Sequence, residues 1–184
     1  MRKLLIACIA ILMVCGSTTS LVAAQDKATP AASDSVAAEE SNAVDPKIGD
    51  TVTYYGEDGS ALGNVTITGI ERGWEDYDEY YEPDAGSEYV AFTVRVESTI
   101  ERGAIDVESY DFSLQTAGGY LWGGSYVSAE KADPPMLEDT VSLAQGDSEE
   151  FTVVFTVIED EPLAHIYWQP DSGVLITAAQ LEGE

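Results

Sequence analysis

The sequence predicts an all-β protein, a two-sheet sandwich of seven to eight antiparallel strands preceded by a signal peptide and a disordered linker. After residue 46 the chain consists of short runs in which apolar and polar residues alternate with a period of two. Glycine, aspartate or proline separates these runs, as is typical of an all-β domain. The apolar spacing of an amphipathic helix is nearly absent, which argues against a helical or mixed fold.

Eight runs have the composition and the alternation of strands. They occupy residues 51–55, 63–72, 89–98, 110–116, 120–126, 150–158, 164–168 and 173–179. The third run places four apolar residues on one face, Val90, Phe92, Val94 and Val96, and the sixth run does the same with Phe151, Val153, Phe155 and Val157. We therefore predict that both sets lie in the core and that these two strands face one another across it.

Residues 1–24 have the pattern of a secretory signal peptide. Arg2 and Lys3 precede an apolar run that is shorter than the roughly 20 residues of a membrane-spanning helix, and small residues end at Ala24. We expect cleavage there, no transmembrane span, and an extracellular, cell-surface or periplasmic location. Lipid anchoring is the less favoured alternative, because almost no apolar segment precedes Cys8 and a valine, not a small residue, precedes Cys15.

The segment 25–46 is rich in alanine, serine and acidic residues and has no aromatic residue, so we predict a disordered linker before a domain at 47–184. No cysteine follows residue 24, which excludes disulfides and cysteine nucleophiles from that domain. The formal net charge of −26 disfavours nucleic acid and anionic membranes as partners. The same charge suits solubility, cations or basic partners.

The apolar runs and turns, taken in order, resemble a family of exported bacterial proteins, the DUF4352 family. This family lies within the immunoglobulin-like superfamily of the mycobacterial secreted antigen MPT63. The matching stretches are 48–52, 65–67, 89–96, 112–114, 143–147 leading into 151–155, and 166–168. A departure occurs at Glu97-Ser98, where the family usually has valine and then asparagine. The resemblance implies an immunoglobulin-like sandwich and an extracytoplasmic location, and it implies no catalytic residue.

The stretch GWEDYDEYYEPDAGSEY, residues 73–89, is the candidate site, and it connects two predicted strands. Its carboxylates could bind calcium, which takes oxygen ligands. The possible calcium ligands are Glu75, Asp76, Asp78, Glu79, Glu82 and Asp84. The spacing fails the EF-hand pattern because Tyr80 and Tyr81 occupy the third-ligand and glycine positions. A solvated connecting loop is the favoured alternative, and no other cofactor is expected.

Aromatic side chains give the same stretch a second possible role, as a surface for an extracytoplasmic protein or glycan. The residues are Trp74, Tyr77, Tyr80 and Tyr81, with Trp122 from the predicted 120–126 strand. A core position is the alternative for Trp122. The oligomeric state is not predicted.

Catalysis is not expected. The only histidine, His165, shares one strand face with Tyr167, and a lone histidine on a strand is more often a structural residue than a catalytic base. Abundant acids alone do not supply a defined pair of carboxylates. Two functional classes remain open. One is an exported binding module that displays the 73–89 loop. The other is an accessory or structural secreted domain that binds no small ligand.

Overall fold

The computed structural model describes residues 42–137 and 139–182. The predicted signal peptide, both cysteines and most of the predicted linker lie outside these residues. Within the described part the chain forms ten strands and two short 3-10 helices, η1 (Ser109–Asp111) and η2 (Pro170–Ser172).

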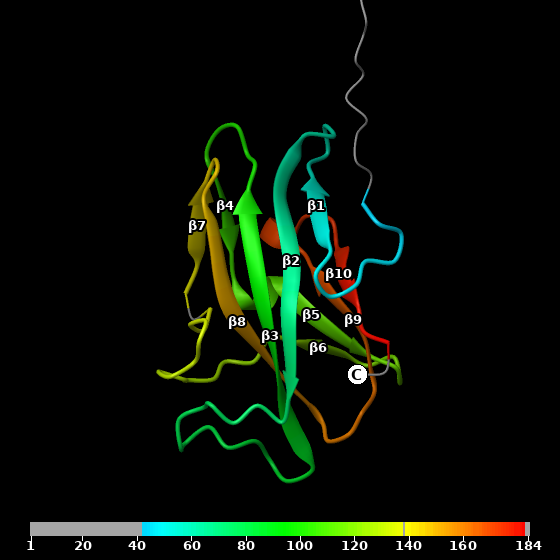
Figure 1. Ribbon diagram of the computed structural model, residues 1–184, viewed down its shortest axis with the longest axis vertical. Coiled ribbons are helices and arrows are strands. Elements are labelled where there is room, and N and C mark those ends of the chain that lie inside the picture. Colours follow the sequence, from blue (N-terminus) through cyan, green and yellow to red (C-terminus); the bar gives the residue numbers. More distant parts are fainter. Residues whose placement is uncertain (1–41, 138, 183–184) are drawn as a thin grey trace, which may run out of the picture. The chain divides into compact units, whose positions relative to one another are not determined.

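The strands form a sandwich of two four-stranded sheets with a small additional sheet (Figure 1). The front sheet has the order β1-β2-β3-β8, with strands Thr51–Tyr55, Ala61–Arg72, Ser87–Ser98 and Ser148–Ile158. The back sheet has the order β10-β9-β5-β6, with strands Ile176–Gln180, Leu163–Trp168, Phe112–Thr116 and Leu121–Gly123. Strands β4 (Ala104–Val107) and β7 (Val141–Ala144) pair with one another. All pairs of named strands are antiparallel.

The predicted all-β sandwich is confirmed, with differences in detail. Each of the eight predicted runs overlaps a strand, but β4 and β7 were not predicted, because four residues are too few to show a clear alternation. The run 120–126 is a strand only at Leu121–Gly123, since the Ser125 N–H turns away to donate to the Val154 carbonyl.

The predicted relation between the two longest apolar strands is wrong. The strands β3 and β8 do not face one another across the core but lie side by side in the front sheet, in register from Ser87 opposite Ile158 to Glu97 opposite Ser148. Both strands therefore send their apolar face the same way, toward the back sheet.

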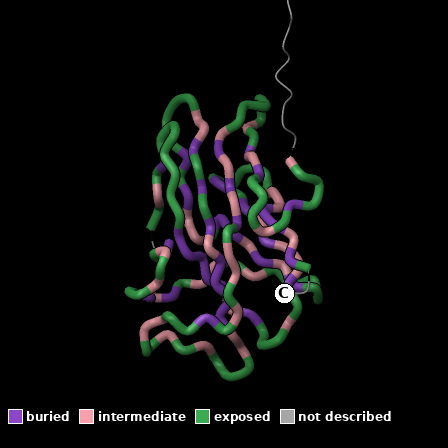
Figure 2. The backbone as a smooth tube through the Cα atoms, viewed as in Figure 1, coloured by how far each residue is buried: buried purple, intermediate pink, exposed green. Residues whose placement is uncertain are grey.

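The main core lies between the sheets, as the buried segments in Figure 2 show. All eight apolar residues predicted for the two long strands are buried in it, and Phe92 of β3 packs edge-on against Phe155 of β8 with ring centroids 5.6 Å apart. From the back sheet, Trp168 is fully buried and stacks on Phe112. This packing confirms the predicted strand faces.

Hydrogen bonding to the domain begins upstream of residue 47. The Asn42 side chain donates to the Thr53 carbonyl and accepts from the Thr53 N–H, both at 2.7 Å. Pro46 is buried, and its carbonyl accepts the Gln180 N–H. Residues 42–46, which composition placed in the linker, thus attach to the sandwich.

Candidate functional site

The 73–89 stretch connects β2 to β3 and extends beyond the lower end of the front sheet in Figure 1. Its N-terminal part continues the β2–β3 hairpin, because the Trp74 N–H donates to the Tyr89 carbonyl at 3.1 Å. An ion pair between Arg72 and Glu88 closes its base. The stretch therefore leaves the paired ends of the two central strands of the front sheet.

Aromatic residues of the stretch pack on the outer face of the front sheet and form a second hydrophobic cluster, the outer cluster. Its buried members are Trp74, Tyr89, Ala91, Val127, Ala129 and Val154, and Tyr77 and Tyr81 pack against them half-buried. The rings of Tyr77 and Tyr89 meet edge to face at 5.3 Å, and the Tyr89 hydroxyl donates to the Tyr81 carbonyl at 2.7 Å. The loop is thus fixed by its own aromatic side chains.

Burial raises the pKa of Tyr89, with smaller contributions from the nearby Tyr77 and the carboxylate of Asp84. The neutral hydroxyl is the form that donates the hydrogen bond to the Tyr81 carbonyl, and the raised pKa favours this form.

A second segment, residues 124–137, lies beside the loop and along the outer edge of β8. The Asp78 N–H donates to the Ser128 carbonyl at 2.9 Å, and the Ser128 hydroxyl donates to the Asp78 carboxylate at 2.6 Å. These reciprocal bonds join residues that are 50 positions apart in the chain. Sequence reasoning did not find this segment, because no local pattern reports a contact of that separation.

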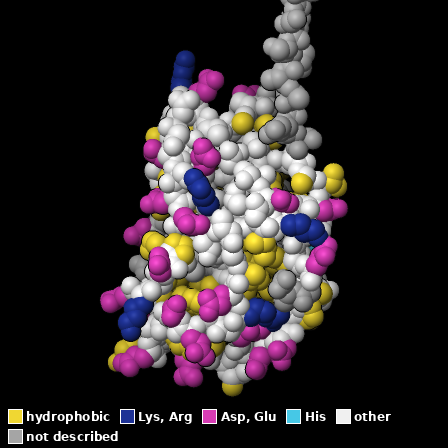
Figure 3. Space-filling model, viewed as in Figure 1, with side chains coloured by type: hydrophobic (Ala, Val, Ile, Leu, Met, Phe, Trp, Pro, Cys, Tyr) yellow, Lys and Arg dark blue, Asp and Glu magenta, His cyan; other side chains and the backbone are white. Residues whose placement is uncertain are grey.

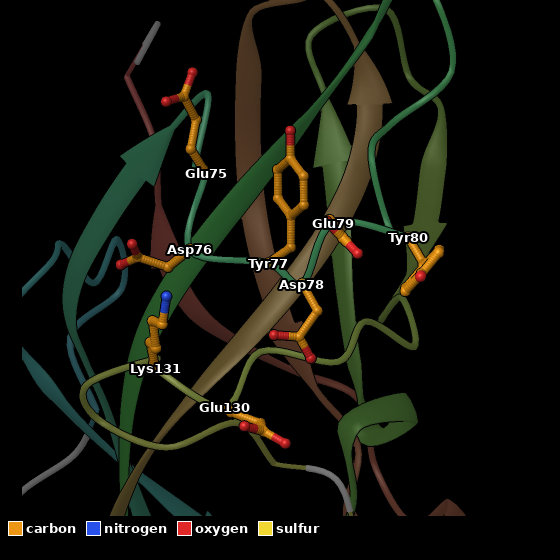
Figure 4. A pocket seen from close by; sticks show the side chains of 8 residues that line it. All are labelled: Glu75, Asp76, Tyr77, Asp78, Glu79, Tyr80, Glu130 and Lys131. Atoms are coloured by element: carbon orange, nitrogen blue, oxygen red, sulfur yellow. The ribbon is translucent and has the colours of Figure 1, made fainter.

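Between the two segments lies an open cavity of about 600 Å³, the acidic hollow. It is lined by Glu75, Asp76, Tyr77, Asp78, Glu79, Tyr80, Glu130 and Lys131. Six of these residues come from the loop and two from the 124–137 segment. Figure 4 shows their side chains. Five of the eight are carboxylates and one is a lysine, so the hollow is strongly negative. Carboxylate side chains also crowd the surrounding surface in Figure 3.

The structure separates the aromatic residues proposed for a ligand surface. Tyr80 is 87% exposed at the rim of the hollow, whereas Trp74 is only 4% exposed and supports the loop from below. Tyr77 and Tyr81 are half-buried. Trp122 packs half-buried against the main core and is not part of the outer cluster. The accessible aromatic surface of the loop is therefore centred on Tyr80.

The possible calcium ligands are not gathered around one point. In the described part of the chain, no group of three or more histidine, cysteine, aspartate or glutamate side chains is arranged to hold a metal ion. The six carboxylates include four that line the hollow and two, Glu82 and Asp84, that do not. Calcium binding stays a prediction.

Another carboxyl group has a perturbed environment, away from the loop. Asp111, at the end of η1, is 9% exposed and accepts the Glu108 N–H at 2.9 Å. The pKa of Asp111 is raised to about 6, mainly by burial and to a smaller extent by the neighbouring carboxylates of Glu108, Asp171 and Asp106, while the hydrogen bond from the Glu108 N–H opposes the rise. His165 lies on β9, on the face shared with Tyr167 as predicted, and stacks on that ring at 5.7 Å.

Solved structures of three bacterial proteins are similar to this chain. The yjhA protein of Bacillus subtilis has a TM-score of 0.55 and 15% identity, over 74% of this chain and 99% of its own. MPT63, a secreted protein of Mycobacterium tuberculosis, has a TM-score of 0.52 and 16% identity, over 73% of this chain and 99% of its own. The fold is MPT63-like.

The third structure, ycdA of Bacillus subtilis strain 168, is described as a candidate lipoprotein. It has a TM-score of 0.50 and 16% identity over 66% of this chain. The match spans only 37% of the length of ycdA. None of the three descriptions names an enzymatic activity. No protein-family model and no curated protein matches the chain. At these identities the likeness shows the fold alone.

No helix among residues 42–137 and 139–182 has the length and apolar character needed to cross a membrane.

Proposed function

We propose that this chain is an exported, non-enzymatic binding module of the DUF4352 type that presents the 73–89 loop to a basic protein partner outside the cytoplasm. The observation that carries the proposal is the acidic hollow, which is formed on a loop anchored by buried aromatic residues. A loop held in one conformation loses little entropy when it binds, which favours recognition over simple solvation.

The chemistry of the hollow indicates the kind of partner. Its five carboxylates attract lysine and arginine side chains, and the exposed ring of Tyr80 at the rim can stack on a guanidinium group. Glu75, Asp76 and Glu79 are exposed and have no hydrogen bond to another described residue, so their oxygens remain available. Signal-directed export and membership of the family agree with the sequence pattern and belong to the same proposal.

An oligolysine peptide and an oligoarginine peptide can test the proposal by isothermal titration with the purified exported chain. The triple variant Glu75→Gln, Asp76→Asn, Glu79→Gln should weaken binding about tenfold at low salt, because three charges at the hollow are removed. Trp74, which lies beneath the loop, supplies a fluorescence readout of binding.

A control variant removes three exposed carboxylates elsewhere, Glu57→Gln, Glu97→Gln and Glu101→Gln, and has the same net charge. Its affinity for the peptides should change less than about twofold. Equal losses in both variants would mean that the peptides sense net charge alone, and the alternative of an accessory domain without a ligand would then be preferred.

A further inference from the structure

The outer face of the back sheet differs from the rest of this acidic surface. Two rows of side chains cross it, each with one residue per strand in the order β10, β9, β5, β6. Their members follow from the strand register, and we call these eight residues the neutral face: Gln180, His165, Gln115 and Leu121 in one row, and Thr177, Tyr167, Ser113 and Gly123 in the other. All eight are exposed or half-buried.

None of the eight residues is an aspartate, glutamate, lysine or arginine, although the chain contains 34 acidic residues. The outer face of the front sheet, by contrast, includes Glu71, Arg95, Glu97 and Glu150. Acidic side chains reach the margin of the neutral face, where Asp45 accepts a hydrogen bond from the Gln180 amide at 2.8 Å. The absence of charge is therefore a local property of one sheet face.

The side chains at the centre of the neutral face combine two aromatic rings with an amide group. The rings of His165 and Tyr167 stack at 22° and 5.7 Å, and the Tyr167 hydroxyl donates to the Gln115 side-chain oxygen at 2.7 Å. This bond orients the Gln115 amide nitrogen, which has no acceptor among the described residues. The Nδ1 atom of His165 is buried and has no partner among the described residues, so the Gln115 amide nitrogen is the group of this pair that faces a ligand.

Beside these rings the surface is low and open. Gly123 has no side chain, and a Cβ atom built on it would meet no atom within 4 Å outside its chain neighbours. Ser113, its partner on β5, is also small. Leu121, which lies on β6 opposite Gln115, is 60% exposed. The face thus offers a shallow floor next to an aromatic wall.

These properties select a ligand class by charge and polarity. A polyanion would be repelled by a chain of net charge −26, and a cation would be attracted to the carboxylates elsewhere. An apolar protein partner would leave the Gln115 amide nitrogen unsatisfied. A neutral glycan fits, because its ring faces stack on aromatic side chains and its hydroxyls accept hydrogen bonds from an amide such as that of Gln115.

We propose that the neutral face binds a neutral polysaccharide, with sugar rings on the His165–Tyr167 surface and a hydroxyl group bonded to the Gln115 amide. This site is separate from the acidic hollow, so the chain has two binding surfaces of different chemistry. One surface takes a basic protein and the other takes an uncharged glycan.

The test uses the exported chain with cellohexaose and laminarihexaose as neutral probes and polygalacturonate as an anionic comparison. Isothermal titration should detect at least one neutral probe at millimolar concentration and should detect no binding of polygalacturonate. Gln115→Ala and Tyr167→Ala should each weaken binding roughly tenfold, since each removes a hydrogen bond or a stacking ring.

Three controls keep the result specific. Tyr167→Phe retains the ring and guards against misfolding, and it should weaken binding less than Tyr167→Ala does. Tyr110→Ala removes a ring that is 71% exposed outside the neutral face, and it should leave binding unchanged, as should the triple variant of the acidic hollow. The proposal fails if neither neutral probe binds, if Gln115→Ala binds normally, or if light scattering shows a dimer that the neutral-face variants dissociate.

Discussion

The two hydrophobic clusters of this protein lie on opposite faces of the same sheet and are built differently. The main core between the sheets is formed by residues that alternate regularly along long strands, such as Phe92 and Phe155. The outer cluster is formed by a loop and a second irregular segment that cover Ala91 and Val154 on the other face. Part of the front sheet is thus buried on both sides. The regular cluster holds the fold, and the irregular one holds the candidate binding loop.

The largest expected effect is loss of packing in the main core. Phe92→Ala should lower the free energy of unfolding by about 4 kcal/mol, because Phe92 is fully buried against Phe155 and leaves a large cavity. Urea denaturation followed by circular dichroism measures the change. Tyr80→Ala, at an exposed position, serves as the control and should change stability by less than about 0.5 kcal/mol. A loss below about 2 kcal/mol for Phe92→Ala would contradict the assigned role of the main core.

A smaller and more local effect is expected in the outer cluster. Trp74→Ala should lower the stability of the loop by about 3 kcal/mol, because it removes the ring on which Tyr77 and Tyr89 pack. Hydrogen exchange should become faster at the Asp78 amide, which bonds to the Ser128 carbonyl, and should change little at Val94 in the main core. Equal acceleration at both amides would show that the two clusters unfold as one unit.

The third prediction concerns pH and the carboxyl group of Asp111. The raised pKa of Asp111, about 6 against an ordinary value of 3.8, means that the folded chain holds this proton more tightly than the unfolded chain. The stability from this group is therefore complete below pH 3.8 and is lost as pH rises through about 6. Asp111→Asn should raise stability at pH 7 by about 1.5 kcal/mol, a value reduced from the full shift for solvent screening.

Thermal melts between pH 4 and pH 8 measure that effect. The gain from Asp111→Asn over the unmodified chain should shrink toward pH 4, where Asp111 is protonated. The same comparison with Glu57→Gln, at an exposed carboxylate, should show no such dependence. A gain that stays constant with pH would remove the electrostatic explanation.

The smallest expected effect separates the two segments that line the acidic hollow. Ser128→Ala should weaken the loop by about 1 kcal/mol, because it removes the 2.6 Å hydrogen bond to the Asp78 carboxylate. Exchange at the Asp78 amide measures the loss, and Ser148→Ala on β8 is the matched control. If the two variants exchange equally at Asp78, the second segment does not support the loop.

Local alternation was enough to predict the strands of the main core, because a residue such as Val94 or Val153 reports its face through its immediate neighbours. The same reasoning placed His165 and Tyr167 together on one face. It could not predict which strands are neighbours, since pairing between β3 and β8 depends on the path of the 49 intervening residues. Strand content was therefore accessible from the sequence, and sheet order was not.

The candidate site was only partly predictable for the same reason. The acidity of residues 75–80 is visible in the sequence, but Glu130 and Lys131 complete the acidic hollow from a distant segment. Trp74 and Tyr80 look equivalent in the sequence, yet one is buried beneath the loop and the other is exposed on it. That distinction requires the outer cluster, which exists only after residues 124–137 lie against β8.

The attachment of Asn42 to Thr53 has a consequence for how the molecule behaves at high concentration. The side-chain amide of Asn42 occupies the N–H and the carbonyl of Thr53 on the edge strand β1, where a strand from another molecule would otherwise pair. At the opposite edge, the Thr152 N–H and carbonyl of β8 are bonded to Pro135 and Leu137. Growth of the front sheet into a fibril would have to displace both segments first.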